Sequence, residues 1–192
     1  MIELPKPQTD GGKPLMRALH ERKTAREFAS DKVPSQVLSN LLWAAWGINR
    51  PDGHRTSPSA GNRQEIDIYI TTADGLYLYH AKAHALQQIL AEDIRALTGK
   101  QAFVKEAPLN LVYVADYAKM PDSKETGRAE EKDFLVAADT GFIGQNVYLF
   151  CASEGLSTVF RAMVDRPSLA KAMNLRPEQK ITFAQSVGYP KR

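Results

Sequence analysis

A run of apolar residues in the middle of the chain constrains the fold most. Pro108 is followed by the nearly continuous apolar segment Leu109 to Ala115. A strand that is apolar at almost every position, rather than at alternate ones, is typical of a strand buried on both faces. The run therefore predicts a central strand in a sheet that other elements cover on both sides.

Other segments indicate what those elements are. Helical spacing of apolar residues predicts helices over residues 15–22, 33–47, 83–98, 134–153 and 167–173. Residues 65–71 alternate strictly, which predicts a strand with Ile66, Ile68 and Ile70 facing inward. Asp74-Gly75 then predicts a turn into a paired strand over 76–79. Further strands are expected near 158–160 and over 181–187.

The order of these elements predicts an α+β protein. No repeat or linker divides the sequence, so we expect one domain over residues 1–192, with residues 1–12 as an extended N-terminal arm. Residues 120–132, which are polar and contain Pro121 and Gly127, predict a loop that leads into the long helix.

Composition excludes several classes of protein. The 25 basic and 22 acidic residues give a net charge of +3, which predicts no dedicated nucleic-acid surface. Cys151 is the sole cysteine, so there is no intrachain disulfide, and a buried free thiol is expected. No apolar run approaches the roughly 20 residues of a membrane span, and Met1 to Pro7 contains no signal-peptide core. These features predict a soluble, cytoplasmic protein without membrane contact, and a leader removed before Met1 stays an alternative.

Motifs for other chemistry are scarce. His80 and His84 have the spacing of two metal ligands on a helix, but His80 ends a predicted strand and no carboxylate follows in a metal pattern. We therefore expect a solvated pair and no metal. His20 and His54 lack a nucleophile at a recognisable spacing, and no dinucleotide-binding or phosphate-loop glycine motif occurs.

Two short segments carry the clearest chemistry. Residues 22–28, Arg-Lys-Thr-Ala-Arg-Glu-Phe, place three cations and a hydroxyl within five positions. Residues 55–64, Arg-Thr-Ser-Pro-Ser-Ala-Gly-Asn-Arg-Gln, form a small-residue turn with two amides at its end. Together they suit a large planar anion, because cations bind phosphate while hydroxyl, amide and backbone N–H groups can recognise a ring. Taken singly, a solvated helix end explains the first segment equally well, and an ordinary loop explains the second segment better.

At these residues the sequence resembles the nitroreductase family of FMN flavoproteins, which carries an Arg-Arg-Ser-x-Arg-x-Phe pattern followed by Pro-Ser-x-x-Asn. Lys23 and Thr24 are conservative departures. Three later stretches also match: 138–146 within the predicted long helix, Glu154 to Arg161, and the near-terminal Gly188-Tyr189-Pro190. The resemblance extends from Leu15 to Pro190. It implies a nitroreductase-like fold, with a small, mostly antiparallel sheet flanked by helices, and a homodimer.

The resemblance also implies the cofactor and its ligands. Arg22, Lys23 and Thr24 would bind the phosphate and ribityl groups of FMN, and Arg26 would approach the N1/O2 edge of the ring. Asn62 and Gln64 would bond the pyrimidine side, while Pro58, Ser59 and Ala60 would reach the cofactor from the partner subunit. The segment Phe160, Arg161 and Ala162 would line the opposite face, with a backbone N–H near N5. Lys191 or Arg192 would replace a basic phosphate ligand that relatives carry in a longer tail.

The implied activity is hydride transfer from NADH or NADPH to a small organic acceptor such as a nitroaromatic or a quinone. The flavin carries the chemistry, so no catalytic side chain is assigned. Arg63, at a position often apolar in relatives, is expected to reshape the substrate side, and the substrate-covering insertion is reduced to Met120 to Asp133. Two alternatives stay open: an FMN dehydrogenase or oxidase of peptide azolines, which the stretch Leu41 to Ala45 favours, and a flavin-binding protein without turnover.

Overall fold

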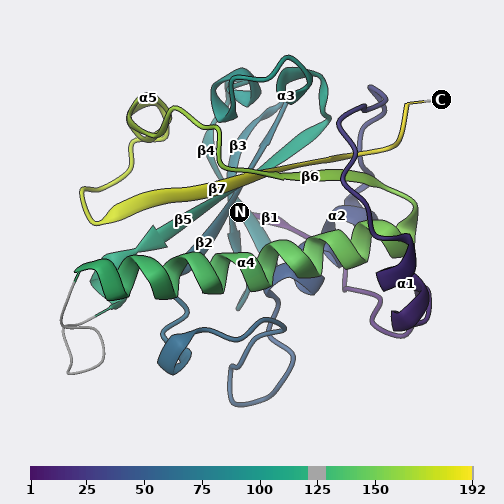
Figure 1. The fold of residues 1–192 in the computed structure, drawn as a ribbon, viewed down its shortest axis with the longest axis horizontal. Helices are drawn as coiled ribbons and strands as arrows, with labels where there is room; N and C mark the ends of the chain where they lie inside the picture. The colour runs from purple at the N-terminus through teal and green to yellow at the C-terminus, as the bar shows by residue number, and fades with distance from the viewer. Residues whose placement is uncertain (121–128, 192) are drawn as a thin grey trace.

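A seven-stranded sheet forms the centre of the molecule. The structure is a computed structural model, and it describes residues 1–120 and 129–191. The strand order is β1-β4-β3-β2-β5-β7-β6, and neighbouring strands pair in antiparallel fashion (Figure 1). The strands are β1 (Ile2–Glu3), β2 (Ile66–Thr72), β3 (Gly75–His80), β4 (Ala85–Leu90), β5 (Leu109–Asp116), β6 (Ser157–Arg161) and β7 (Gln179–Gly188). The predicted α+β class and antiparallel sheet are confirmed.

Helices cover both faces of this sheet (Figure 1). They are α1 (Leu15–Glu21), α2 (Ser35–Trp46), α3 (Phe103–Glu106), α4 (Ala129–Glu154) and α5 (Arg166–Ala172), with 3₁₀ turns η1 (Ala60–Asn62), η2 (Arg95–Thr98) and η3 (Tyr117–Lys119). Helices α2 and α4 pack on one face, and α5 packs on the other.

Strand β5 is buried on both faces, as its apolar run predicts. All eight of its residues are buried. Leu109, Leu111, Tyr113 and Ala115 join the core under α2 and α4, whereas Val112 and Val114 join the core under α5. The strand therefore lies between two apolar layers, and its neighbours β2 and β7 position the loops that follow.

The prediction of a helix over residues 83–98 is wrong. Residues 85–90 form β4, which pairs with β3, and only Arg95–Thr98 form a helical turn. A bulge opposite Leu76 and Tyr77 places one extra residue in β4, so Leu86 faces the α2/α4 core while Ile89 and Leu90 both face the α5 core. The extra residue converts a two-residue alternation into an apparent three-to-four residue spacing, which explains the misreading.

The two histidines beside this hairpin are not a solvated pair. His84 is half-buried, with its ring within hydrogen-bond distance of Ser39 Oγ (2.7 Å) and Tyr79 Oη (3.0 Å). Burial lowers the pKa of His84, which favours the neutral ring. His80 contacts Gln87 instead. Among the residues the structure describes, no group of three or more metal-binding side chains occurs.

Helix α4 runs along the sheet as its longest element (Figure 1). Within the described ranges it is the one helix whose length and composition would allow it to cross a membrane. Its buried residues Val136, Ile143, Val147 and Cys151 pack in the core under the sheet, and Cys151 is the predicted buried thiol. The reduced insertion expected over Met120 to Asp133 lies largely outside the described residues, which resume at Ala129.

Candidate functional site

The cationic segment lies along the edge of the sheet. Ala25 donates its N–H to Thr158 O on β6 (3.0 Å), and Phe28 forms an antiparallel bridge with Pro190. Arg22 caps the C-terminus of α1. Because β6 is an edge strand, residues 22–28 continue the hydrogen bonding of the sheet by backbone contacts. Their side chains remain available to a ligand.

The three cations of this segment make no ion pair within the described part of the chain. Glu21, the adjacent acid, is engaged by Lys13 and Arg17, which lower its pKa to about 2. Lys23 and Arg26 are exposed, and Lys23 lines a cavity of about 480 Å³. Residues 22–28 also include Glu27, so the segment carries a net charge of +2, and such an excess of positive charge beside a cavity favours an anionic ligand.

Tyr148 joins three parts of the predicted site. Its hydroxyl accepts the N–H of Phe160 (3.0 Å) and is hydrogen-bonded to Thr24 Oγ1 (2.9 Å). The Arg22 guanidinium lies over its ring, 5.3 Å from the centroid. Tyr148 lies within the helix predicted over residues 134–153, but nothing in the spacing indicates where a helical tyrosine directs its hydroxyl.

The hydrogen bonds of β6 indicate which of Phe160, Arg161 and Ala162 has a backbone N–H available to a ligand. All of β6 pairs with β7, but Thr158 O and Phe160 N point away from β7, to Ala25 and Tyr148. Alternation places Ala162 next on this outer edge. Ala162 is exposed, and its N–H has no hydrogen-bond partner in the described part of the chain. Of the three expected residues, Ala162 offers the free N–H.

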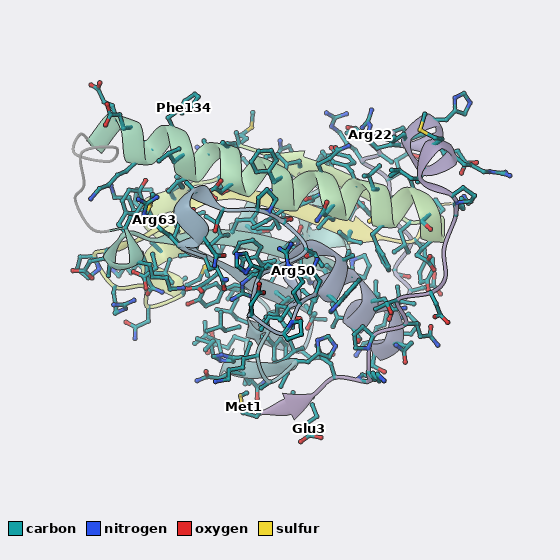
Figure 2. The ribbon with its side chains drawn as sticks, turned by 90° about the horizontal axis from the view of Figure 1, so that it is seen from below. Met1, Glu3, Arg22, Arg50, Arg63 and Phe134 are labelled. Carbon is teal, nitrogen blue, oxygen red and sulfur yellow. The ribbon has the colours of Figure 1, made fainter. Side chains whose placement is uncertain are left out.

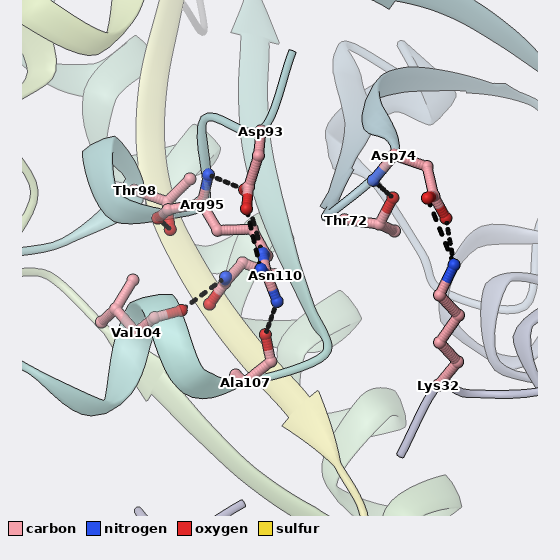
Figure 3. Close-up of polar contacts among 9 residues, drawn as sticks. All are labelled: Lys32, Thr72, Asp74, Asp93, Arg95, Thr98, Val104, Ala107 and Asn110. Atoms are coloured by element: carbon pink, nitrogen blue, oxygen red, sulfur yellow. Dashed lines mark hydrogen bonds and ion pairs between the residues drawn. The ribbon is translucent and has the colours of Figure 1, made fainter. Parts of the chain in front are cut away.

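Arg161 does not line a ligand face. Its side chain is buried, and its guanidinium donates to Thr98 O (2.7 Å) and Asn110 Oδ1 (3.0 Å). Asn110 in turn donates to Val104 O (Figure 3). Burial without a carboxylate lowers the pKa of Arg161 to about 10. Arg161 therefore joins β6 to η2 and β5, a structural role that the motif alone does not reveal.

The ring of Phe160, by contrast, is half-buried. It lies 4.7 Å from the ring of Phe183 and 5.8 Å from that of Tyr113, measured between centroids. Gly144 of α4 is in contact with it, because a Cβ there would approach the Phe160 ring to 2.5 Å. The small residue permits α4 to pack closely on β6.

The second segment is a strained and heavily hydrogen-bonded loop. Gly61, Asn62 and Gln64 all have positive φ values, of 57°, 52° and 51°. The Gln64 amide accepts from Arg55 Nε (2.7 Å) and donates to Gly53 O and Asn62 Oδ1 (both 3.0 Å). Gln64 is thus occupied within its own chain and shapes the loop, instead of presenting a free amide to a ligand.

Helix α4 holds this loop at two points. Asn146 donates to Ser57 Oγ (2.8 Å) and Ala44 O (3.0 Å). Two turns earlier on the helix, Asp139 Oδ2 accepts the N–H of Ala60 (2.8 Å). Arg63, which the sequence placed on the substrate side, donates to Ala60 O (3.0 Å). Pro58 and Asn62 are left exposed, and Ser59 Oγ accepts the Gln64 N–H.

The exposed end of the second segment is anchored far from the first along α4. Arg22 contacts Tyr148 and Ala60 contacts Asp139, nine positions or about 14 Å apart along the helix, although Ser57 is bound at Asn146, close to Tyr148 in sequence. Figure 2 shows Arg22 and Arg63 toward opposite ends of this helix. Lys191 lines a different cavity, of about 890 Å³, with Phe28, Lys105 and Pro108, and Arg192 lies outside the described residues.

That larger cavity has charged walls of both signs. Lys32 pairs with Asp74, and Arg95 pairs with Asp93 and donates to Ala107 O (Figure 3). These two cations are neutralised by adjacent acids, unlike those of residues 22–26.

The comparison with known families identifies the family of this chain. A model of the nitroreductase family matches residues 19–189. The chain belongs to this family. As a nitroreductase-family protein, it has the fold that the sequence resemblance implied.

Three known proteins are similar to this nitroreductase-family chain over most of its length. A solved structure from Ralstonia eutropha JMP134, which carries a provisional nitroreductase name, is 39% identical with a TM-score of 0.93, over 100% of this chain and 90% of that chain. A protein of Methanocaldococcus jannaschii with a similarly provisional name is 34% identical over 156 residues, 76% of each chain. A structure from Desulfovibrio desulfuricans, solved in complex with FMN, has a TM-score of 0.68 at 18% identity, over 95% of this chain and 89% of that chain.

Proposed function

We propose that this protein is an FMN-dependent oxidoreductase that acts as a homodimer. The observation that carries the proposal is the group of unpaired cations at Arg22, Lys23 and Arg26 beside the edge of β6. A phosphate supplies the missing negative charge, and reduction of a flavin ring brings further negative charge that a guanidinium stabilises. The FMN complex of the distant D. desulfuricans structure supports the choice of cofactor.

The residues on this edge fit a mononucleotide. Arg22 and Thr24, with Lys23, would bind the phosphate and ribityl oxygens, and Arg26 would stabilise the reduced ring. Ala162 would donate its free backbone N–H to the ring. Bound FMN would accept a hydride from NADH or NADPH and pass it to a small acceptor such as a nitroaromatic or a quinone. The protein orients the reactants and excludes water, so no side chain is required as an acid or a base.

A second copy of the chain would complete the site. The outward face of α4 carries Phe134 and Phe142, which are 75% and 49% exposed, and α1 exposes Leu15, Met16 and Leu19. Exposed apolar side chains on these two helices favour an interface between subunits. Pairing through α4 would bring the partner subunit's Pro58, Ser59 and Asn62 to the cations of the first subunit. This accounts for the separation of the two segments along α4.

Absorption spectroscopy of the purified protein tests the proposal. We expect a flavin spectrum, release of FMN rather than FAD on denaturation, a dimeric mass by light scattering, and bleaching on anaerobic addition of NADH or NADPH. Steady-state assays with a nitroaromatic, a quinone and an azoline-containing peptide then separate the acceptors. FMN that neither nucleotide reduces would indicate a flavin-binding protein, and failure to bind FMN after reconstitution would refute the proposal.

A further inference from the structure

Two acidic side chains are buried beneath the Pro58–Asn62 loop. Glu65 is 0% exposed and Asp139 is 3% exposed. Asp139 Oδ2 accepts the N–H of Ala60, whereas neither Glu65 oxygen has a hydrogen-bond partner of good geometry in the described part of the chain. A buried, ionised carboxylate without such a partner is costly. The arrangement therefore requires an explanation.

The surrounding charges do not neutralise Glu65. From η3, Lys119 faces it but pairs with Asp67 at 2.9 Å, and Tyr117 donates its hydroxyl to Asp133. From α4, Asp139 adds a second negative charge. Burial is the largest effect on Glu65, and together with Asp139 it raises the pKa of the Glu65 carboxyl to about 7. Lys119 opposes this shift without cancelling it.

A proton on Glu65 removes the buried negative charge that has no partner. A neutral Glu65 carboxyl can donate its O–H to the neighbouring Asp139. Asp139 Oδ2 meanwhile accepts the Ala60 N–H. When Glu65 loses this proton, two like charges face each other in a buried site, and the contact between α4 and the loop is weakened.

We propose that contact between the buried carboxyl groups of Glu65 and Asp139 holds the Pro58–Asn62 loop in the conformation that contacts the partner subunit's flavin, so that both act as positioning residues. This inference rests on the proposed function. It assigns chemistry to the Ala138-Asp139-Thr140-Gly141 stretch, whose match to relatives otherwise indicates only close helix packing. FMN affinity should therefore decrease as Glu65 ionises.

The test compares the intact protein with Glu65→Gln, whose amide donates to Asp139 at every pH. FMN dissociation constants are measured by flavin fluorescence from about pH 6 to about pH 9, on either side of the Glu65 pKa. We expect the affinity of the parent to fall roughly tenfold more than that of Glu65→Gln across this range, equivalent to about 1.4 kcal/mol. Ionisation of the FMN phosphate affects both proteins equally, so the difference isolates Glu65. Asp74→Asn, which removes an exposed carboxylate, serves as the control and should follow the parent.

A second measurement does not depend on flavin. In the apo protein, NMR should show the Glu65 side-chain carboxyl carbon and the Ala60 amide titrating together near neutral pH, and the Ala60 amide should stop titrating in Glu65→Gln. An Ala60 amide that ignores pH in the parent would overturn this inference alone, as would identical pH profiles for FMN affinity in parent and variant. A parent that binds no FMN at any pH would refute the proposed function, and with it the flavin-linked part of this inference.

Discussion

The two segments of the candidate site are held in opposite ways. Residues 22–28 are held to the sheet by backbone contacts, from Ala25 to Thr158 of β6 and from Phe28 to Pro190, and their charged side chains make no ion pair in the described part of the chain. The loop over residues 55–64 is fixed by side chains, among them Gln64, Asn146 and Asp139, and its outward surface is backbone and small residues.

This difference follows from what each segment would have to recognise. Attraction between a guanidinium and a phosphate falls slowly with distance, so mobile side chains suffice. Hydrogen bonds to the edge of a ring are directional and need donors fixed in advance. Positive φ values at Gly61, Asn62 and Gln64 show that the loop maintains a costly conformation. The predictions below test whether the two segments cooperate across a subunit interface.

Separating the subunits should have the largest effect. Phe142→Lys places a charge on the exposed apolar face of α4 that we assign to the interface. We expect a monomer by light scattering, and FMN affinity lower by roughly 100-fold or more, because the loop contributed by the partner is lost. Leu97→Lys, which alters an exposed leucine on η2, should remain dimeric and yellow. A monomeric Phe142→Lys protein that binds FMN like the parent would show that one chain forms the whole site.

Removing the phosphate ligand should come next. Arg22→Ala deletes a charge-assisted hydrogen bond, worth about 1.5–3 kcal/mol, so FMN should bind roughly 10- to 150-fold more weakly. Titration by fluorescence at two salt concentrations measures this, and the salt dependence should decrease in the variant. The exposed Arg50 provides the control, since Arg50→Ala should change neither quantity. Equal affinities for Arg22→Ala and the parent would remove Arg22 from the site.

Sequence patterns predicted the parts of the fold in which one physical effect dominates. The apolar run of β5 specifies burial on both faces without reference to distant residues, and the structure confirms it. The β4 strand was missed because a bulge, which depends on pairing with β3, changes the local spacing. Local pattern is therefore reliable for the centre of the sheet and fails where long-range pairing alters it.

The site was predictable only as a set of residue types. The motifs identified both segments, but side-chain directions depend on the assembled fold. Arg161 is directed into a buried cluster and Gln64 into its own loop, so neither presents the group that the motif suggests. Tyr148 and the Glu65–Asp139 pair were missed because their contacts join residues far apart in the sequence.

Ionisation of Glu65 should have a smaller effect, which is on the stability of the protein. The pKa of Glu65 is raised to about 7 from the ordinary value of 4.5, so the folded protein binds this proton more tightly than the unfolded chain. Its stabilising contribution is complete below about pH 4.5 and is lost as the pH rises through 7. Relative to Glu65→Gln, the parent should lose about 1–2 kcal/mol of unfolding free energy over this window, measured by urea denaturation at fixed protein concentration. A constant difference from about pH 4 to about pH 8 would contradict the shift.

The smallest effect should come from the hydroxyl that joins the cationic segment to β6. Tyr148→Phe keeps the ring beneath Arg22 but removes the partner of Thr24 Oγ1 and of the Phe160 N–H. Both groups are near the surface, where water replaces the lost hydrogen bonds, so we expect a loss of about 1 kcal/mol in stability.

FMN affinity distinguishes a positioning role for Tyr148 from a purely structural one. Tyr148→Phe should bind FMN roughly fivefold more weakly, since Thr24 is no longer held, and Tyr148→Leu should bind more weakly still because it also removes a cation–π contact worth about 0.5–1 kcal/mol. Tyr77→Phe, which loses one hydrogen bond to Asp74 O on the other side of the molecule, should match the loss of stability without the loss of affinity. If Tyr148→Phe and Tyr77→Phe bind FMN equally well, Tyr148 only stabilises the edge of the sheet, and the cationic segment recognises its ligand by charge alone.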